Sequence, residues 1–168
     1  MNRIIETERL LIRPFSIEDA PAAFAWLSDP RVNRYMPYSL YTSVEQAENW
    51  IASIKKDSKE FVFVLKETAF PIGAGSVKLQ EDGRWEIGYN IRHDCWNRGY
   101  TTEAAKALIK WAHEYCGAQH FMARHATANV ASGKVLLKCG FQFDRYGEYS
   151  RYDDSETFQA THYTLTLE

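Results

Sequence analysis

The sequence predicts an α+β fold, with one mixed, mostly antiparallel central sheet of about seven strands and about four flanking helices. In the first half of the chain, short apolar runs are joined by turn residues, as in antiparallel hairpins. In the second half, strand-like runs alternate with helical patterns, as in strand–helix–strand units. With 168 residues, 45% of them apolar, the chain suits a single domain over residues 1–168 with a sizeable core.

The first third of the chain is predicted to form one strand and two helices. The strand covers residues 9–15, and a helix follows over 16–29 with an apolar stripe at helical spacing. A second helix is predicted over 42–56, because Ser43 and Gln46 have capping-box spacing at its start.

Alternating and continuous apolar runs then predict three strands, over residues 60–66, 71–80 and 84–92. A hairpin turn with Asp82 and Gly83 at its tip joins the last two. These strands form the antiparallel part of the sheet.

The second half of the chain is predicted to contain two helices and three strands. Helices over 101–117 and 129–141 show apolar residues at helical spacing and each contains a glycine at or near its end. Strands are predicted over 120–126, 141–150 and 156–167, the last two as a closing antiparallel pair.

The overall charge and the length of the apolar runs argue against some classes of protein. Twenty basic and 22 acidic residues give a net charge of −2, which argues against direct nucleic-acid binding. No apolar run approaches the ~20 residues that span a membrane, and the charged N-terminal segment predicts no secretion signal. The sequence leaves the oligomeric state open.

The cysteines and histidines give no sign of a disulfide framework or a metal site. Cys95, Cys116 and Cys139 form no C-x-x-C unit, and the five histidines lack metal-ligand spacing. We therefore expect reduced cysteines, a cytoplasmic location and no bound metal.

Gly99 stands directly before the longest predicted helix, between Arg98 and Tyr100. The first turn of a helix has unpaired N–H groups and partial positive charge, and a glycine lets an anion approach the backbone closely. Arg98 adds a formal charge, and Thr101 and Thr102 add hydroxyl groups. The site suits a pyrophosphate, and the alternative is an ordinary strand-to-helix turn. The loop lacks the P-loop and dinucleotide-binding patterns, which argues against an ordinary NTPase or dehydrogenase.

Several segments together resemble the GNAT acyltransferases, and within them the Rim-type ribosomal-protein N-acetyltransferase branch. The resemblance runs in order over nearly the whole chain. It is carried by "TERLLIRPFSIEDA" (7–20), "WLSDPRVNRYM" (26–36), "EIGYNI" (86–91), "CWNRGYTTEA" (95–104) and "NVASGKVLLKCGF" (129–141).

The resemblance implies that acetyl-CoA is the acetyl donor, with its pyrophosphate on the loop at Gly99. It also implies that the fourth and fifth predicted strands, 84–92 and 120–126, splay apart. The pantetheine arm would insert between them and bond strand backbone near Ile91. Asn129 could bond this arm, although a helix-capping role would explain it equally well.

Two positions depart from the W-G-x-G-Y-A pattern usual in that branch. Asn97 replaces a glycine, and asparagine tolerates a positive φ better than most residues. Thr101 replaces an alanine or glycine, and its hydroxyl could bond phosphate. The coenzyme-binding residues expected from the resemblance are Ile91, Asn97, Arg98, Gly99, Tyr100, Thr101, Thr102, Asn129 and Ser132.

Glu86 is the candidate general base. Strand alternation places it with Gly88 and Asn90 on the polar face of a strand expected to line the acceptor site. It would take a proton from an incoming amine, directly or through water. The alternative is a carboxylate that is exposed or paired with Arg84 or Arg124.

Ser132 is the second catalytic candidate. By resemblance it faces the coenzyme's sulfur, and its hydroxyl would serve the departing thiolate. The alternative is a serine that bonds helix backbone. His125 is the histidine expected nearest the acceptor site, with a non-catalytic role favoured. Aromatic residues that would either wall an acceptor pocket or pack in the core are Trp26, Tyr35, Tyr38, Tyr41 and Trp85.

The resemblance thus implies an N-acetyltransferase that moves an acetyl group directly from acetyl-CoA to a primary amine. The acceptor would be the N-terminus of a ribosomal or other protein, or a small-molecule amine. An α-amine has a pKa of ~8, whereas the lysine side chain has a pKa of ~10.4. A much larger fraction of an α-amine is therefore neutral at pH 7. The alternatives are a non-catalytic CoA or acyl-CoA sensor module, and an interaction protein that has only the fold.

Overall fold

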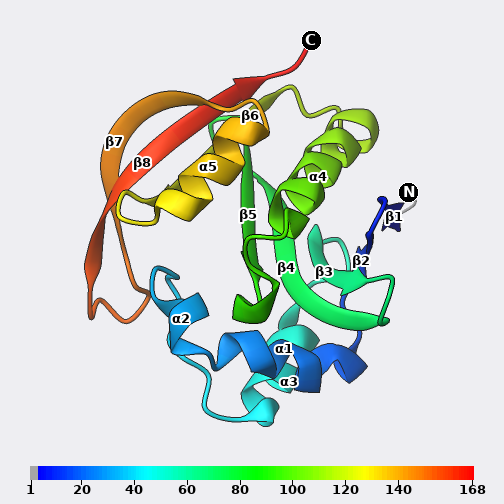
Figure 1. Cartoon of the computed structure of the whole chain (residues 1–168). Coiled ribbons are helices and arrows are strands. Elements are labelled where there is room, and N and C mark those ends of the chain that lie inside the picture. Colours follow the sequence, from blue (N-terminus) through cyan, green and yellow to red (C-terminus); the bar gives the residue numbers. More distant parts are fainter. Residues whose placement is uncertain (1–3) are drawn as a thin grey trace.

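The computed structural model describes residues 4–168, which form an eight-stranded sheet with helices on both faces (Figure 1). The strand order is β1-β2-β3-β4-β5-β6-β8-β7, and the β5–β6 pair is parallel whereas the other neighbouring pairs are antiparallel. The strands are β1 (Ile5–Glu6), β2 (Leu10–Pro14), β3 (Glu60–Leu65), β4 (Phe70–Leu79), β5 (Trp85–Ile91), β6 (His120–Ala126), β7 (Gln142–Ser150) and β8 (Thr157–Thr166).

The helices divide into two groups that cover opposite faces of the sheet. One core lies between the sheet and α4 with α5, and a second lies between the sheet and α1 with α3. The helices are α1 (Ala20–Leu27), α2 (Pro30–Asn33), α3 (Val44–Ser53), α4 (Tyr100–Cys116) and α5 (Val130–Lys138), with 3₁₀ turns η1 (Ile17–Asp19) and η2 (His93–Cys95).

The predicted fold class is confirmed, although the counts differ slightly. The described residues contain eight strands and five α-helices, where about seven and about four were predicted. The additional strand β1 has two residues and the additional helix α2 has four. Elements this short show no hydrophobic period. The helix predicted over 16–29 begins as the 3₁₀ turn η1 and becomes α-helical at Ala20.

Strands β5 and β6 diverge soon after they pair. Each strand has seven residues, but the parallel pairing comprises Trp85 with Phe121 and Glu86 with Met122. From Ile87 onward no further pairs join the two strands. The predicted splaying of the fourth and fifth expected strands is therefore confirmed.

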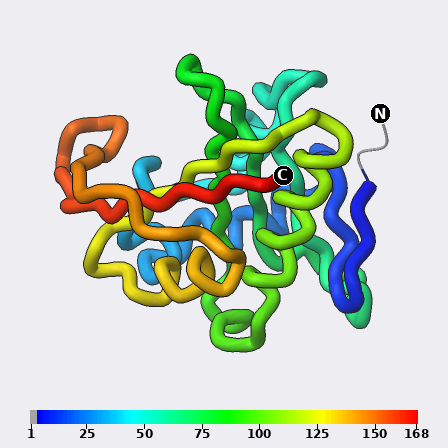
Figure 2. Tube along the Cα trace, turned by 90° about the horizontal axis from the view of Figure 1, so that it is seen from above, coloured from blue at the N-terminus to red at the C-terminus, as the bar shows by residue number. Residues whose placement is uncertain are grey.

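The β7–β8 hairpin forms the sheet edge opposite β1, and Figure 2 shows it extending to one side of the molecule. Its tip is tied to the end of α2 and to the segment that follows. Arg151 Nη1 donates to Asn33 Oδ1 at 3.1 Å and to the Met36 carbonyl at 3.0 Å. Tyr152 N–H donates to the Pro37 carbonyl at 2.8 Å. These bonds hold the hairpin and the α2 segment together.

None of the three cysteines forms a disulfide, and Cys95 is buried. Because no disulfide contributes to stability, we expect the thermal midpoint of unfolding to stay unchanged when dithiothreitol is added. Thermal melts with and without reductant test this. A large drop in the midpoint would contradict the structure.

Within residues 4–168, none of the helices combines the length and apolar character needed to cross a membrane. The same residues contain no group of three or more His, Cys, Asp or Glu side chains that could hold a metal ion.

Candidate active site

Helix α4 begins directly after Gly99, which has a φ of +80°. Glycine adopts this left-handed conformation without steric cost. Because Gly99 holds the N-cap position, no cap side chain bonds the free N–H groups of the first turn. The helix has 17 residues, so its dipole adds partial positive charge at this end. These features suit an anionic group, and pyrophosphate binding at this loop stays a prediction.

The side chains of this loop differ in what they can offer a ligand. Asn97 and Arg98 are exposed, and Asn97 has a φ of +59°, so it adopts the conformation a glycine would favour. Tyr100 is buried in the core, with the Arg9 guanidinium 4.4 Å from its ring centroid. Tyr100 can therefore reach a ligand only through its backbone. The two threonines that follow are half-buried.

Residues from the start of the chain hold this loop in place, a contact that the sequence did not reveal. Glu103 Oε1 accepts from Thr7 Oγ1 at 2.6 Å and from the Arg9 N–H at 2.8 Å. Arg9 Nε donates to Glu103 Oε2 at 2.7 Å, and Arg9 Nη1 donates to the Arg98 carbonyl at 2.8 Å. Arg9 thus connects β2, the loop and the first turn of α4.

Glu103 should therefore stabilise the fold. Burial alone would raise the pKa of Glu103, but hydrogen bonds from Thr7 and Arg9 outweigh it and hold the pKa below its ordinary value. A lowered pKa means that the stabilisation is present above the unfolded-state pKa and is lost as the pH falls through the folded-state value. We expect Glu103→Gln to lower the free energy of unfolding at pH 7 by about 1–2 kcal/mol.

Urea unfolding of Glu103→Gln at a series of pH values from neutral to acidic tests this prediction. The variant should show a shallower loss of stability in acid than the unsubstituted protein. Glu114→Gln is the control, because Glu114 forms an exposed ion pair with Lys110 at 3.8 Å, a kind worth about 0–1 kcal/mol. Equal losses in the two variants would contradict a special role for Glu103.

Where β5 and β6 diverge, Tyr89 connects β5 to the start of α5. Its hydroxyl lies 3.0 Å from Ser132 Oγ and donates to the Ser132 carbonyl at 3.1 Å. Burial raises the pKa of the Tyr89 hydroxyl, and its hydrogen bond to Ser132 offsets only part of this effect. Tyr89 is therefore protonated at neutral pH. Tyr89 was not among the site residues predicted from the sequence.

Two predicted contacts of the pantetheine arm lie at the edges of this region. Asn129 occupies the N-cap of α5, but its side chain makes no capping bond to the helix, so capping does not explain it. The Ile91 carbonyl accepts from Trp96 Nε1 at 2.9 Å. A carbonyl has two lone pairs, so one remains for another donor.

Glu86 lies on the opposite face of β5 from Tyr89, in the last row that β5 and β6 share. Its Oε2 accepts from Gln80 Nε2 at 2.9 Å, and its Oε1 lies 3.8 Å from Arg124 Nε. Of the two cations considered as partners, Arg124 is therefore the one in contact, whereas Arg84 pairs with Asp82 at 2.7 Å.

Asn90 lies on the same face of β5 as Glu86, and only part of its amide group is hydrogen-bonded. Its Nδ2 donates to the Tyr38 hydroxyl at 3.0 Å, while its buried Oδ1 has no hydrogen-bond partner among residues 4–168. Tyr38 is thus an aromatic candidate that reaches the predicted acceptor side. Trp26 is fully buried in the second core, and Tyr35 packs edge-on against Phe158.

The side chain of His125 is buried and contacts other residues of the chain. It stacks on the Tyr163 ring at 5.5 Å between centroids. Its Nδ1 lies 2.6 Å from the Ala126 carbonyl. These contacts agree with the non-catalytic role that the sequence favoured.

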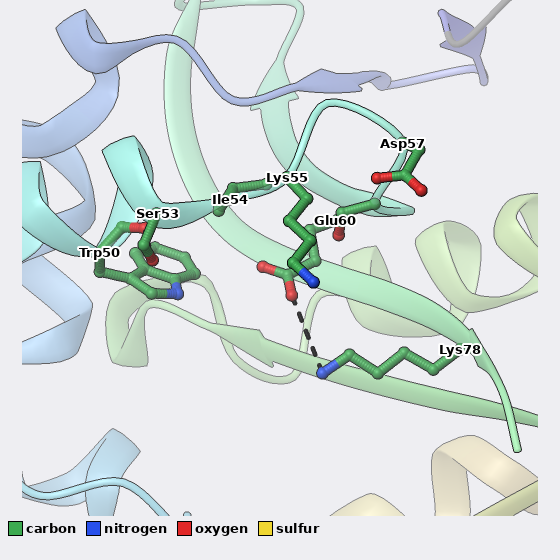
Figure 3. Close-up of a pocket in the computed structure, with 8 residues that line it drawn as sticks. Trp50, Ser53, Ile54, Lys55, Asp57, Glu60 and Lys78 are labelled. Atoms are coloured by element: carbon green, nitrogen blue, oxygen red, sulfur yellow. Dashed lines mark hydrogen bonds and ion pairs between the residues drawn. The ribbon is translucent and has the colours of Figure 1, made fainter.

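A surface pocket of about 440 Å³ lies between the end of α3 and strands β3 and β4 (Figure 3). Lys78 and Glu60 form an ion pair across it at 3.8 Å. Trp50, Ile54 and Lys55 also contribute to its lining, and no predicted site residue does. The pocket borders the candidate active site, since Lys78 is the cross-strand neighbour of Glu86.

Comparisons with known proteins agree with this geometry. The chain is 33% identical over 143 residues to the uncharacterized N-acetyltransferase p20 of Bacillus licheniformis, a match that covers 81% of the chain and 80% of that protein. The crystal structure of a GNAT-family acetyltransferase from Bacillus anthracis superposes with a TM-score of 0.87 at 25% identity, covering 97% of this chain and 98% of that one.

The microcin C7 self-immunity acetyltransferase MccE, in complex with acetyl-CoA and AMP, shares the fold with a TM-score of 0.83 at 14% identity. That match covers 96% of this chain and 94% of MccE. The family model described as an acetyltransferase (GNAT) domain matches residues 9–142. The β5–β6 pair diverges and α4 begins directly after Gly99, in agreement with that match. Because the family model covers more than half of its residues, the chain belongs to the GNAT acetyltransferase family.

Proposed function

We propose that this chain, acting as a single domain over residues 1–168, transfers an acetyl group from acetyl-CoA directly to a primary amine. The main support for this proposal is the position of Glu86 and of the Ser132–Tyr89 pair. They lie close to the point where β5 and β6 diverge, on opposite faces of the sheet. Family membership supports acetyl-CoA as the donor. The amine acceptor is the protein N-terminus or small amine that the sequence suggested.

The proposed coenzyme site follows the α4 N-terminus and the diverging strands. The first turn of α4 would bind the pyrophosphate, and the start of α5 would meet the pantetheine arm. No metal takes part in this proposal. The residues proposed to bind the coenzyme are Ile91, Asn97, Arg98, Gly99, Tyr100, Thr101, Thr102, Asn129 and Ser132.

The proposed chemistry assigns one proton transfer to each face of the sheet. Glu86 accepts the proton of the amine as the new C–N bond forms, directly or through water. The Ser132 hydroxyl, hydrogen-bonded to Tyr89, gives its proton to the thiolate as the C–S bond breaks and takes another proton from solvent in the same step, so that the hydroxyl is restored. Asn90 Oδ1, which lacks a partner among residues 4–168, would accept a hydrogen bond from the amine.

Isothermal titration with acetyl-CoA, combined with thiol release over a panel of amines, tests the proposal. Binding followed by turnover of at least one amine is expected. Binding without turnover of any amine would favour the sensor module, and no binding at tens of micromolar would favour an interaction protein.

We also propose a cytoplasmic location, supported by the three cysteines, none of which forms a disulfide. Fractionation of the source cells tests it, and recovery of the protein outside the cytoplasmic fraction would contradict it.

A further inference from the structure

Three side chains with nitrogen donors stand side by side across strands β6, β8 and β7. The register pairs Arg124 with His162 and His162 with Arg145. Directly opposed residues project to the same face of a sheet. Glu86 pairs with Met122, two residues before Arg124, so Glu86 shares this face. Arg124, His162 and Arg145 are called the cationic row below.

His162, the central member of this row, is buried but not hydrogen-bonded. It is 5% exposed, and neither ring nitrogen has a hydrogen-bond partner in the described part of the chain. Buried polar groups are rarely left without partners in native proteins, because each such group is costly. Burial lowers the pKa of His162, and Arg145 and Arg124 lower it further, so the ring is neutral with one N–H to donate.

The side chains of His162 and Arg145 converge at Gly147. A Cβ at this glycine would stand 2.8 Å from His162 Nε2 and 3.1 Å from Arg145 Nη1. The absence of a side chain at position 147 therefore lets both nitrogen groups meet over the same stretch of β7.

The two arginines are only loosely paired with carboxylates. Arg124 Nε lies 3.8 Å from Glu86 Oε1, and Arg145 Nε lies 3.9 Å from Asp144 Oδ2. Both distances exceed that of a charge-assisted hydrogen bond, so these carboxylates do not saturate the five donors of a guanidinium. A guanidinium fork matches the oxygens of a carboxylate or phosphate.

We propose that the cationic row binds an anionic group of the acceptor, so that the substrate is a small primary amine carrying a carboxylate or phosphate. This inference rests on the proposed function. The amine is proposed to lie at Glu86 and Asn90. The row begins at Arg124, which lies diagonally across from Glu86 on β6, with its Nε 3.8 Å from Glu86 Oε1. The bonds of Arg151 that tie the β7–β8 tip to the α2 segment favour a small acceptor over a polypeptide, which would have to pass them.

Matched pairs of acceptors test this inference in one assay of thiol release. One arm compares an α-amino acid with its amide, and the other compares ethanolamine phosphate with ethanolamine. The anionic member of at least one pair should have the higher kcat/KM, and the arms show which anion is bound. Arg145→Gln should raise KM for that member about tenfold, as expected for a lost hydrogen bond to a charged group, and leave the neutral member within about twofold.

Lys110→Gln is the matched control, because it removes one positive charge from an exposed position on α4. It should change neither member of a pair. Equal use of anionic and neutral amines by the unsubstituted protein would overturn the inference, as would an Arg145→Gln defect of the same size for both.

A second measurement separates this inference from the proposed function. If no amine is turned over, the proposed function fails, and the CoA-loaded protein is titrated with the same amines. Weaker binding of the anionic amine by Arg145→Gln would then still support the cationic row. Unchanged binding in that variant would overturn it.

Discussion

Gly99→Glu is expected to weaken acetyl-CoA binding by about 100-fold or more, equivalent to about 2.7 kcal/mol, while the protein stays folded. The substitution places a negative charge at the first turn of α4, where the pyrophosphate is proposed to lie. It also forces a side chain onto a backbone with a φ of +80° and places a Cβ 3.3 Å from Arg9 Nη2. Isothermal titration measures the affinity, and circular dichroism checks the fold.

Gly117→Glu is a closely matched control for this experiment. Gly117 ends the same helix with a φ of +67°, and a Cβ there would meet no atom within 4 Å. The control therefore imposes similar backbone strain and the same charge change at the opposite end of α4. It should lose stability but bind acetyl-CoA normally. A folded Gly99→Glu protein with unchanged affinity would mean that Gly99 serves only as a turn.

The long elements of this fold are predictable because their residues carry a regular hydrophobic period. The helix expected over 101–117 is found as Tyr100–Cys116, and the strand expected over 84–92 is found as Trp85–Ile91. Short elements lack such a period. Helix α2 depends instead on local bonding, since Asp29 Oδ1 accepts from the Arg31 N–H at 2.9 Å and Pro30 starts the helix.

The loop before α4, where the pyrophosphate is proposed to bind, stands out in the sequence because its candidate residues are consecutive. The departure at Asn97 is accommodated by a φ of +59°, which asparagine tolerates. The contacts that support the loop could not be predicted in this way. Arg9 and Glu103 are 94 residues apart, and Tyr89 and Ser132 are 43 apart, so their pairing depends on how the sheet brings the elements together.

The residues that surround His162 could not be predicted from the sequence either. Alternation along β8 gives the face of each residue, but the bulge between Phe143 and Arg145 sets which β7 residue lies opposite His162. A shift of one residue would move Arg145 to the other face. The cationic row is therefore a product of strand register.

Glu86→Gln is expected to lower kcat by about 10²- to 10⁴-fold, the usual cost of losing a general base. The amide keeps the size of the side chain and can still bond Gln80, but it cannot take the proton. Acetyl-CoA affinity should stay within about threefold, because the phosphate and pantetheine contacts are proposed to lie elsewhere. The deficit should shrink as pH rises, since more of the acceptor is then already neutral. Steady-state kinetics over a range of pH measures both parameters.

The contacts of Glu86 provide the control and an alternative outcome for this prediction. Glu60→Gln removes a strand carboxylate that has an ion pair of the same 3.8 Å length, with Lys78, and should leave kcat unchanged. If Glu86 serves only to hold Arg124, its substitution would change KM for an anionic acceptor while kcat stays near normal. That result would assign Glu86 to acceptor binding and leave proton removal to solvent. Loss of folding or of coenzyme binding would instead identify a carboxylate needed by the sheet itself, through its bonds to Gln80 and Arg124.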